Sequence, residues 1–109
     1  MLTFNALADP VRAEIVRRLA ERDLPAGEIA TLFPISRPAV SRHLSVLRRS
    51  RLVRVRGEAQ RRIYSLDAAG LDEAGRWIEE TRRVWNERLD ALGRHLDDVA
   101  ANGDRHEPT

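Results

Sequence analysis

The amino-acid sequence predicts a mainly α-helical domain that carries one β-hairpin and ends in a long helix. Two changes in the spacing of apolar residues lead to this prediction. Apolar residues follow helical spacing up to about residue 50 and alternate with other residues between residues 52 and 66. They follow helical spacing again from residue 69 to residue 100. With 109 residues, the chain is expected to form a single domain.

The first two helices are predicted on either side of Asp9. A short helix should cover residues 2–7. Asp9 is a suitable N-cap for the second helix, and Pro10 fits its first position because the missing N–H has no partner there. This second helix should end near Arg22. Its apolar face consists of Val11, Ile15, Val16, Leu19 and Ala20.

Residues 26–50 predict two further helices joined by a tight turn. The first should cover residues 26–33, because Pro34 disfavours a helical conformation at the residue before it. Ser36 is a suitable N-cap for the second helix. The inward face of that helix consists of Val40, Leu44 and Leu47. A helix, a tight turn and a capped helix form the helix-turn-helix motif, whose second helix reads DNA.

Alternating apolar residues then predict a β-hairpin. Apolar residues alternate with arginines before a turn at residues 57–60, and alternate with polar residues again up to Leu66. A hairpin that directly follows the second helix of a helix-turn-helix is a wing. The predicted fold class is therefore mainly α, a winged helix-turn-helix with one hairpin.

The last predicted element is an amphipathic helix over residues 69–100. At 1.5 Å per residue it would be about 45 Å long, which exceeds the diameter of a domain of this size. We therefore expect its apolar stripe to pack against the same helix of a second copy, with the first helix alongside. The alternative is a helix that folds back on its own core at Gly93. The residues expected at the homodimer interface are Leu2, Phe4, Trp77, Ile78, Trp85, Leu89, Leu92 and Leu96.

The basic residues are concentrated in the middle of the chain. Residues 37–66 contain nine Arg against one acidic residue, a net charge of +8, whereas residues 1–36 sum to −1 and residues 67–109 to −5. A basic segment between acidic ones is typical of a binding site for a polyanion such as DNA. A solvated charged face is the alternative. Residues 1–100 would form the DNA-binding and dimerisation domain, and the polar residues 101–109 a flexible tail.

We expect double-stranded DNA to contact the outer side of the second helix of the motif and the wing. A recognition helix contacts base edges near its N-terminus, and arginine binds guanine through two hydrogen bonds. The residues predicted to read bases are Arg37, Ser41 and Arg42, and those predicted to contact phosphates are Ser36 and Ser45. The wing residues predicted to enter the minor groove are Arg54, Arg56, Arg61 and Arg62. The alternatives are that Ser36 is only a helix cap and that the wing arginines only protect an edge strand.

Other functional classes lack the residues that they need. The chain has no cysteine; His43 adjoins the core face of the recognition helix, and His95 and His106 are too few for a zinc site. No Gly-rich phosphate loop or catalytic cluster is visible, so we expect no metal, no cofactor and no enzymatic activity. Since no membrane span or signal peptide is visible either, we expect a cytoplasmic protein.

Three stretches of the chain resemble the ArsR-type winged-helix repressors. These stretches are residues 6–12 with Ile15-Val16, residues 35–44 with Val46-Leu47, and residues 61–66. The resemblance covers about residues 4–100 and implies a homodimeric repressor that binds a short inverted repeat, often in its own promoter.

The chain departs from that family at two places. Metal-sensing members carry a cysteine motif before the recognition helix, or His and acidic ligands in the last helix, whereas residues 26–30 here lack a thiol and the last helix has one His. The resemblance therefore implies no metal inducer. The family also often has Gly at the end of the recognition helix, where this chain has Arg51, and a left-handed Arg51 would cost roughly 1 kcal/mol.

The predicted function is therefore sequence-specific repression of transcription, with an inducing signal that the sequence does not identify. Two other functions stay open at this point. One is a protein-interaction module, such as an antitoxin, that uses the basic face to bind an acidic partner. The other is a nonspecific chromosome-coating protein with similar affinity for every duplex.

Overall fold

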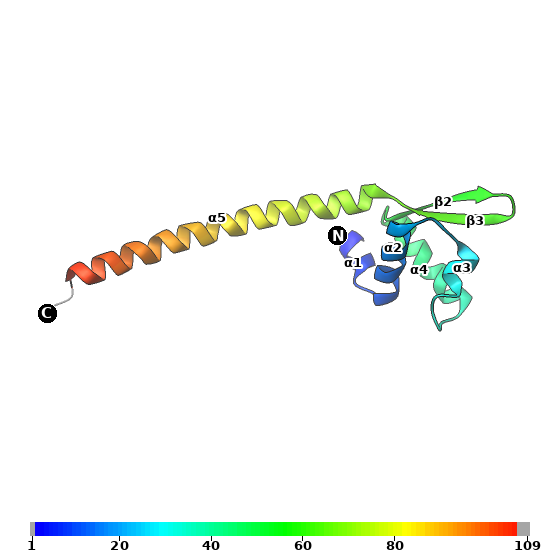
Figure 1. The fold of residues 1–109 in the computed structure, drawn as a ribbon, viewed down its shortest axis with the longest axis horizontal. Coiled ribbons are helices and arrows are strands. Elements are labelled where there is room, and N and C mark those ends of the chain that lie inside the picture. The colour runs from blue at the N-terminus through cyan, green and yellow to red at the C-terminus, as the bar shows by residue number, and fades with distance from the viewer. Residues whose placement is uncertain (1, 107–109) are drawn as a thin grey trace. The chain divides into compact units, whose positions relative to one another are not determined.

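The computed structural model describes residues 2–106, and the side chains of residues 3–102, as two compact units. The first unit ends at Gly75 and the second begins at Arg76. The elements can be followed in Figure 1: α1 (Leu2–Leu7), α2 (Pro10–Glu21), β1 (Leu24–Pro25), α3 (Ala26–Ala30), α4 (Arg37–Arg49), β2 (Val53–Glu58), β3 (Arg61–Leu66) and α5 (Ala68–His106). This confirms the predicted fold class, a mainly helical winged helix-turn-helix with a hairpin wing and a long C-terminal helix.

The wing is part of a three-stranded antiparallel sheet with the order β1-β3-β2. Strands β2 and β3 pair from Val53↔Leu66 to Glu58↔Arg61, so the turn between them is shorter than predicted. Strand β1, which pairs Leu24 with Tyr64, was not predicted. Two residues are too few to show the alternation that identifies a strand in a sequence.

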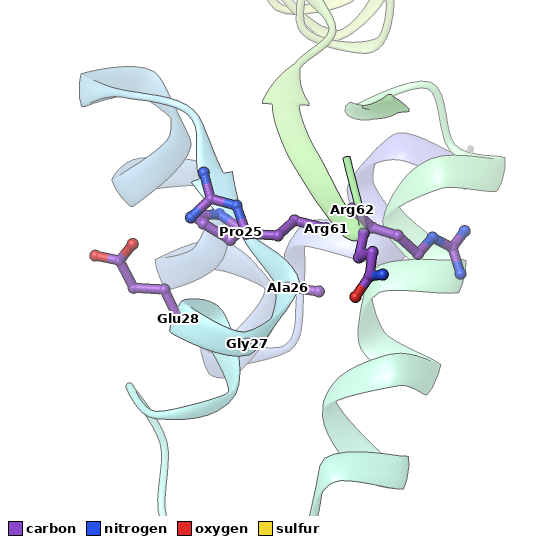
Figure 2. Close-up of a pocket in the computed structure, with 7 residues that line it drawn as sticks. Pro25, Ala26, Gly27, Glu28, Arg61 and Arg62 are labelled. Atoms are coloured by element: carbon purple, nitrogen blue, oxygen red, sulfur yellow. The ribbon is translucent and has the colours of Figure 1, made fainter. Parts of the chain in front are cut away.

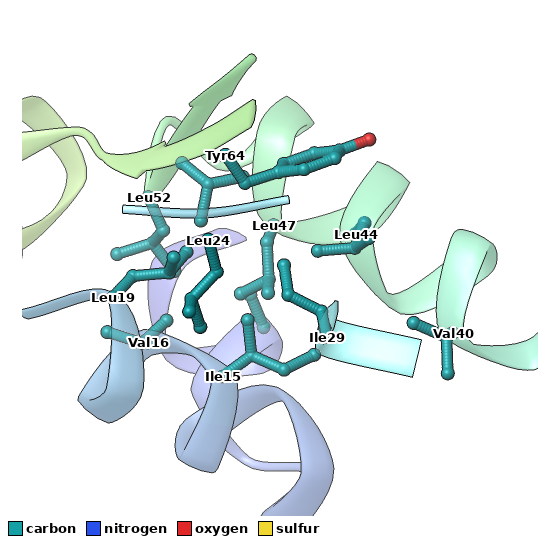
Figure 3. Close-up of a cluster of buried hydrophobic side chains, with 12 residues drawn as sticks. Ile15, Val16, Leu19, Leu24, Ile29, Val40, Leu44, Leu47, Leu52 and Tyr64 are labelled. Atoms are coloured by element: carbon teal, nitrogen blue, oxygen red, sulfur yellow. The ribbon is translucent and has the colours of Figure 1, made fainter. Parts of the chain in front are cut away.

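The hydrophobic core lies in the first unit, among α2, α3, α4 and the sheet. Figure 3 shows its side chains pointing toward one another from all of these elements. The largest fully buried side chains are Ile15, Ile29, Leu47, Leu52 and Val53. Because the inward face of α4 is held in this core, its opposite face is turned outward.

Two predicted helix ends are wrong. Helix α3 ends at Ala30 rather than at residue 33, because the N–H groups of Thr31 and Leu32 donate to carbonyls three residues back and tighten the last turn. Helix α5 continues to His106, past the end predicted at residue 100. It also runs through Gly93 without a break, so the alternative of a helix folded back at this glycine is wrong.

Asp9 caps α2 as predicted, with its Oδ2 accepting the backbone N–H of Arg12 at 3.0 Å. We expect Asp9→Ala to lower the free energy of unfolding by about 1 kcal/mol, and Asp9→Asn, which keeps a capping oxygen, to lower it much less. The Arg12 N–H holds the pKa of Asp9 below its ordinary value of 3.8. A depressed pKa means that the charged cap stabilises the fold above pH 3.8 and loses this effect as the pH falls through the folded-state pKa.

Urea unfolding at neutral pH and at pH values below 3.8 measures both effects of Asp9. The difference between the wild type and Asp9→Ala should shrink on acidification. A difference that stays constant, or a full loss in Asp9→Asn, would contradict the role of the carboxylate as a charged cap.

The C-terminus of α4 forms a Schellman motif centred on Arg51. Its backbone φ is 59°, in the left-handed region that favours glycine. The N–H of Leu52 donates to the carbonyl of Leu47 at 3.0 Å, and both side chains lie in the core. The carbonyl of Arg51 in turn accepts the N–H of Gly70 at 2.8 Å. A Cβ on Gly70 would lie only 2.7 Å from that carbonyl oxygen, so the first turn of α5 needs glycine here.

Arg51→Gly is expected to stabilise the protein by about 0.5–1 kcal/mol. The substitution relieves roughly 1–2 kcal/mol of left-handed strain, and the extra freedom of glycine in the unfolded chain offsets part of this gain. Arg48→Gly is the matched control, because it removes an arginine from the helical part of α4 and should cost about 1 kcal/mol. Thermal unfolding measures both, and a destabilised Arg51→Gly variant would argue against strain at this position.

The second unit carries a row of exposed large apolar side chains, which we term the α5 stripe. The α5 stripe consists of Trp77, Ile78, Val84, Trp85, Leu89, Leu92, Leu96 and Val99. Their exposed fractions in the single chain range from 43% at Leu89 to 57% at Leu96. Of the α1 residues predicted at the same interface, Phe4 is half-buried, and the side chain of Leu2 lies outside the described side chains. Within residues 2–106, no helix has the length and apolar character needed to cross a membrane.

Candidate nucleic-acid interface

The outward face of α4 brings the predicted base-reading residues together. Arg37, Ser41 and Arg42 are exposed, whereas the residues of the inward face are buried. This separation follows from helical periodicity, because residues three and four positions apart share a face. Ser45, one turn after Ser41, is exposed on the same side. The first three turns of α4 therefore present two guanidinium groups and two hydroxyls to solvent.

Ser36 is the N-cap of α4. Its Oγ accepts the backbone N–H of Ala39 at 3.2 Å, and the residue is exposed. The hydroxyl proton remains available to donate, because the cap uses only a lone pair of the oxygen. The capping role predicted for Ser36 is thus confirmed, and its predicted contact with a phosphate stays a prediction.

A groove of about 490 Å³ separates the wing from the start of α3 (Figure 2). It is lined by Pro25, Ala26, Gly27, Glu28, Gln60, Arg61 and Arg62. Arg61 extends across the groove toward Pro25, whereas Arg62 extends away on the other side of β3, as alternate residues of a strand do. Both are exposed, as is Arg54 on β2. These three wing arginines are therefore accessible to a ligand.

Arg56 differs from the other wing arginines because it is paired within the chain. Its guanidinium donates to Asp23 at 2.8 Å and to the Oγ of Ser65 at 3.0 Å, and lies 3.6 Å from Glu58. The bond with Arg56 lowers the pKa of Asp23, and the same bond raises the pKa of Arg56. Sequence reasoning missed this contact because Asp23 precedes the unpredicted strand β1 and lies 33 residues before Arg56.

Arg12 connects α2 to both α1 and the recognition helix α4. Its guanidinium donates to the carbonyls of Ala6 at 2.7 Å and Asn5 at 3.2 Å, and one of its nitrogens lies 3.2 Å from Nδ1 of His43. His43 is partly buried, and its Nδ1 lies 3.9 Å from Asp9. The partial burial of His43 agrees with its predicted position beside the core face of α4, whereas no role of Arg12 was predicted. Arg12 lies within residues 6–12, whose resemblance to known repressors could have drawn attention to it.

Among the described residues, no group of three or more His, Cys, Asp or Glu side chains is placed so that it could hold a metal ion. His43 and His95 therefore each lack the neighbours that a metal centre of protein ligands would need in this part of the chain.

Comparison with known proteins identifies the family to which the chain belongs. Residues 7–56, which include α4 and most of β2, match the model of a helix-turn-helix domain family. The HTH-type transcriptional regulator Rv2034 of Mycobacterium tuberculosis is 43% identical over 94 residues, which cover 86% of this chain and 85% of the relative. The transcriptional repressor SdpR of Bacillus subtilis is 35% identical, over 69% of this chain and 83% of the relative.

Solved structures agree with the sequence comparison. An ArsR-like transcriptional regulator from Rhodococcus sp. RHA1 superposes with a TM-score of 0.75 at 32% identity, over 85% of this chain and 88% of that one. The similarity includes the winged helix-turn-helix and reaches beyond it. This chain therefore belongs to the ArsR family of winged helix-turn-helix transcriptional regulators, a family of DNA-binding proteins rather than enzymes.

Proposed function

We propose that this protein is a homodimeric repressor that binds an inverted-repeat operator and responds to a signal other than a metal ion. The outward face of α4 is the observation that carries the proposal. Arg37, Ser41 and Arg42 lie there without ion-pair partners within residues 3–102, so their donors are available to base edges. Ser36 and Ser45 would contact phosphates and set the depth of the helix in the major groove.

The wing would contribute electrostatic contacts to the DNA backbone and the minor groove. Arg54, Arg61 and Arg62 are exposed and can move toward a narrow, electronegative groove. Arg56 would have to exchange Asp23 for a phosphate, so we expect it to contribute less than the other three. Only the structure distinguishes the expected contributions of the wing arginines to DNA binding, because all four arginines look alike in the sequence.

Homodimerisation would follow from the α5 stripe. Eight large apolar side chains with about half of their surface exposed are costly in water, and a second copy of the same helix offers a complementary surface. A dimer presents two α4 helices, which would read two half-sites separated by about one turn of DNA. Proposing a repressor rather than an activator is supported by the relative SdpR, which is a repressor.

Titration of the purified protein against its own upstream DNA and against random duplex tests the proposal. We expect preference for the upstream DNA and weaker binding as the salt concentration rises, because bound arginines displace counterions. In a promoter assay, added protein should lower transcript yield, and an increase would identify an activator. Equal, weak binding to both duplexes would argue against self-regulation. Selection of bound fragments from genomic DNA would then either find a distant operator or find none, and the second result would favour a protein partner.

A further inference from the structure

A second pocket lies between α1 and the C-terminal half of α4. Its volume is about 330 Å³, at the lower end of the roughly 300–1,000 Å³ that ligand pockets span. It is lined by Asn5, Ala6, Arg12, Val46, Arg49 and Ser50. None of these residues is among the DNA contacts proposed above, so a ligand here need not compete with DNA for the same side chains.

The guanidinium groups of this pocket's two arginines have no carboxylate within ion-pair distance among residues 3–102, although the charge of Arg12 helps to lower the pKa of Asp9. Arg12 is partly buried, and its guanidinium contacts the carbonyls of Asn5 and Ala6 and Nδ1 of His43, none of which is a carboxylate. Within residues 3–102, neither Arg12 nor Arg49 forms an ion pair. A partly buried guanidinium with no carboxylate in direct contact, next to a second, exposed guanidinium, favours the binding of an anion.

The remaining walls indicate what kind of anion fits. Val46 provides apolar surface and Asn5 provides an amide group, whereas Ala6 is fully buried and the Ser50 hydroxyl already donates to the carbonyl of Val46 at 2.9 Å. An inorganic anion would leave this apolar surface in contact with water. A carboxylate with a short apolar body would place its charge beside the guanidinium groups and bury its apolar part against Val46.

We propose that the pocket between α1 and α4 binds a small organic carboxylate, held by Arg12 and Arg49. The ligand would act as an effector, and this regulatory role rests on the DNA-binding function proposed above. Because a bound anion cancels positive charge beside α4, it weakens the attraction of this helix to DNA phosphates. Coupling between two sites of one protein is commonly fivefold or more, so we expect operator affinity to fall by at least about fivefold at saturation.

The binding test uses the full chain without DNA. Benzoate and butyrate are titrated, with benzamide as the uncharged counterpart and inorganic phosphate as an anion without an apolar body. Backbone amide NMR shifts report the site, and we expect saturable shifts at Asn5, Ala6 and Ser50 with the two carboxylates. Benzamide should cause none, and phosphate should bind more weakly.

Arg49→Gln is the decisive variant, because Arg12 also holds α1 and its replacement would disturb the fold. We expect Arg49→Gln to weaken carboxylate binding at least about fivefold, which is the loss of a charge-assisted hydrogen bond. Arg48→Gln, an exposed neighbour outside the pocket, should leave it unchanged. Equal losses in both variants, phosphate binding as tight as benzoate binding, or no saturable shifts up to millimolar concentrations would each overturn the carboxylate site.

Operator titration of the same samples separates the two proposals. Operator affinity that falls when benzoate or butyrate saturates the pocket supports the effector role. Saturable carboxylate binding with unchanged operator affinity would overturn that role. A protein that binds its operator tightly but no carboxylate would overturn the pocket assignment and leave the proposed function standing.

Discussion

Leu89→Asp is expected to convert the proposed dimer into a monomer and to abolish its preference for the operator over random duplex. Leu89 lies near the middle of the α5 stripe and is 43% exposed in the single chain. In the proposed dimer, each copy would have to bury an unpaired carboxylate there. This costs about 3 kcal/mol or more, which raises the dimer dissociation constant over a hundredfold.

Light scattering coupled to size-exclusion chromatography measures the mass of the Leu89→Asp variant, and circular dichroism shows whether its helices persist. Asn86→Asp is the matched control, because it adds the same charge to α5 at an exposed position outside the α5 stripe. The control should remain dimeric and bind DNA. A folded Leu89→Asp protein that is still dimeric would place the interface elsewhere.

Loss of dimerisation would also weaken operator binding, because the proposed operator has two half-sites. A dimer binds both half-sites in one event, whereas two monomers must each pay the cost of association. We therefore expect the variant to retain weak, salt-sensitive binding to any duplex and to lose its preference for the operator. This pattern distinguishes failed dimerisation from unfolding, because an unfolded protein would bind neither the operator nor random duplex.

Arg42→Ala is expected to weaken operator binding about 5- to 150-fold and to relax sequence preference. These limits correspond to the 1–3 kcal/mol that a bidentate contact to a base contributes. Arg42 is exposed on the outward face of α4 and has no ion-pair partner within residues 3–102. Its removal should therefore leave the fold intact and act on DNA alone.

Arg61→Ala provides the comparison for Arg42→Ala, because Arg61 lies on the wing and is proposed to contact DNA without reading bases. It should weaken binding to operator and random duplex alike and reduce the salt dependence by about one phosphate contact. Titration of both variants on both duplexes separates the two roles. Equal losses on operator and random DNA for Arg42→Ala would contradict its assignment to base reading.

Features encoded in consecutive residues were predictable from the sequence. The caps of α2 and α4 depend on Asp9 and Ser36 with their immediate neighbours, and the structure confirms both. The left-handed backbone of Arg51, which the resemblance suggested, is also present. Helix capping is local, so a short stretch of sequence contains all the information that it needs.

Features that depend on distant contacts were not predictable. Strand β1 exists because Leu24 pairs with Tyr64, forty residues later in the chain. The pairing of Arg56 with Asp23 depends on that strand in turn, and so does its lower expected contribution to DNA binding. The pocket beside Arg12 likewise needs α1 and α4 to meet, and no spacing in the sequence indicates which face of α4 is next to α1.

The close approach of Gly70 to Arg51 limits where the chain length can change. Deleting one residue between Leu66 and Gly70 would put Leu71 at the contact, and inserting one would put Ala69 there. Each has a Cβ, which at this position would lie 2.7 Å from a backbone oxygen. Gly57 of β2 differs, since a Cβ there would meet nothing within 4 Å. Insertions or deletions between Leu66 and Gly70 should therefore be rejected, whereas Gly57→Ala in β2 should be tolerated by the fold.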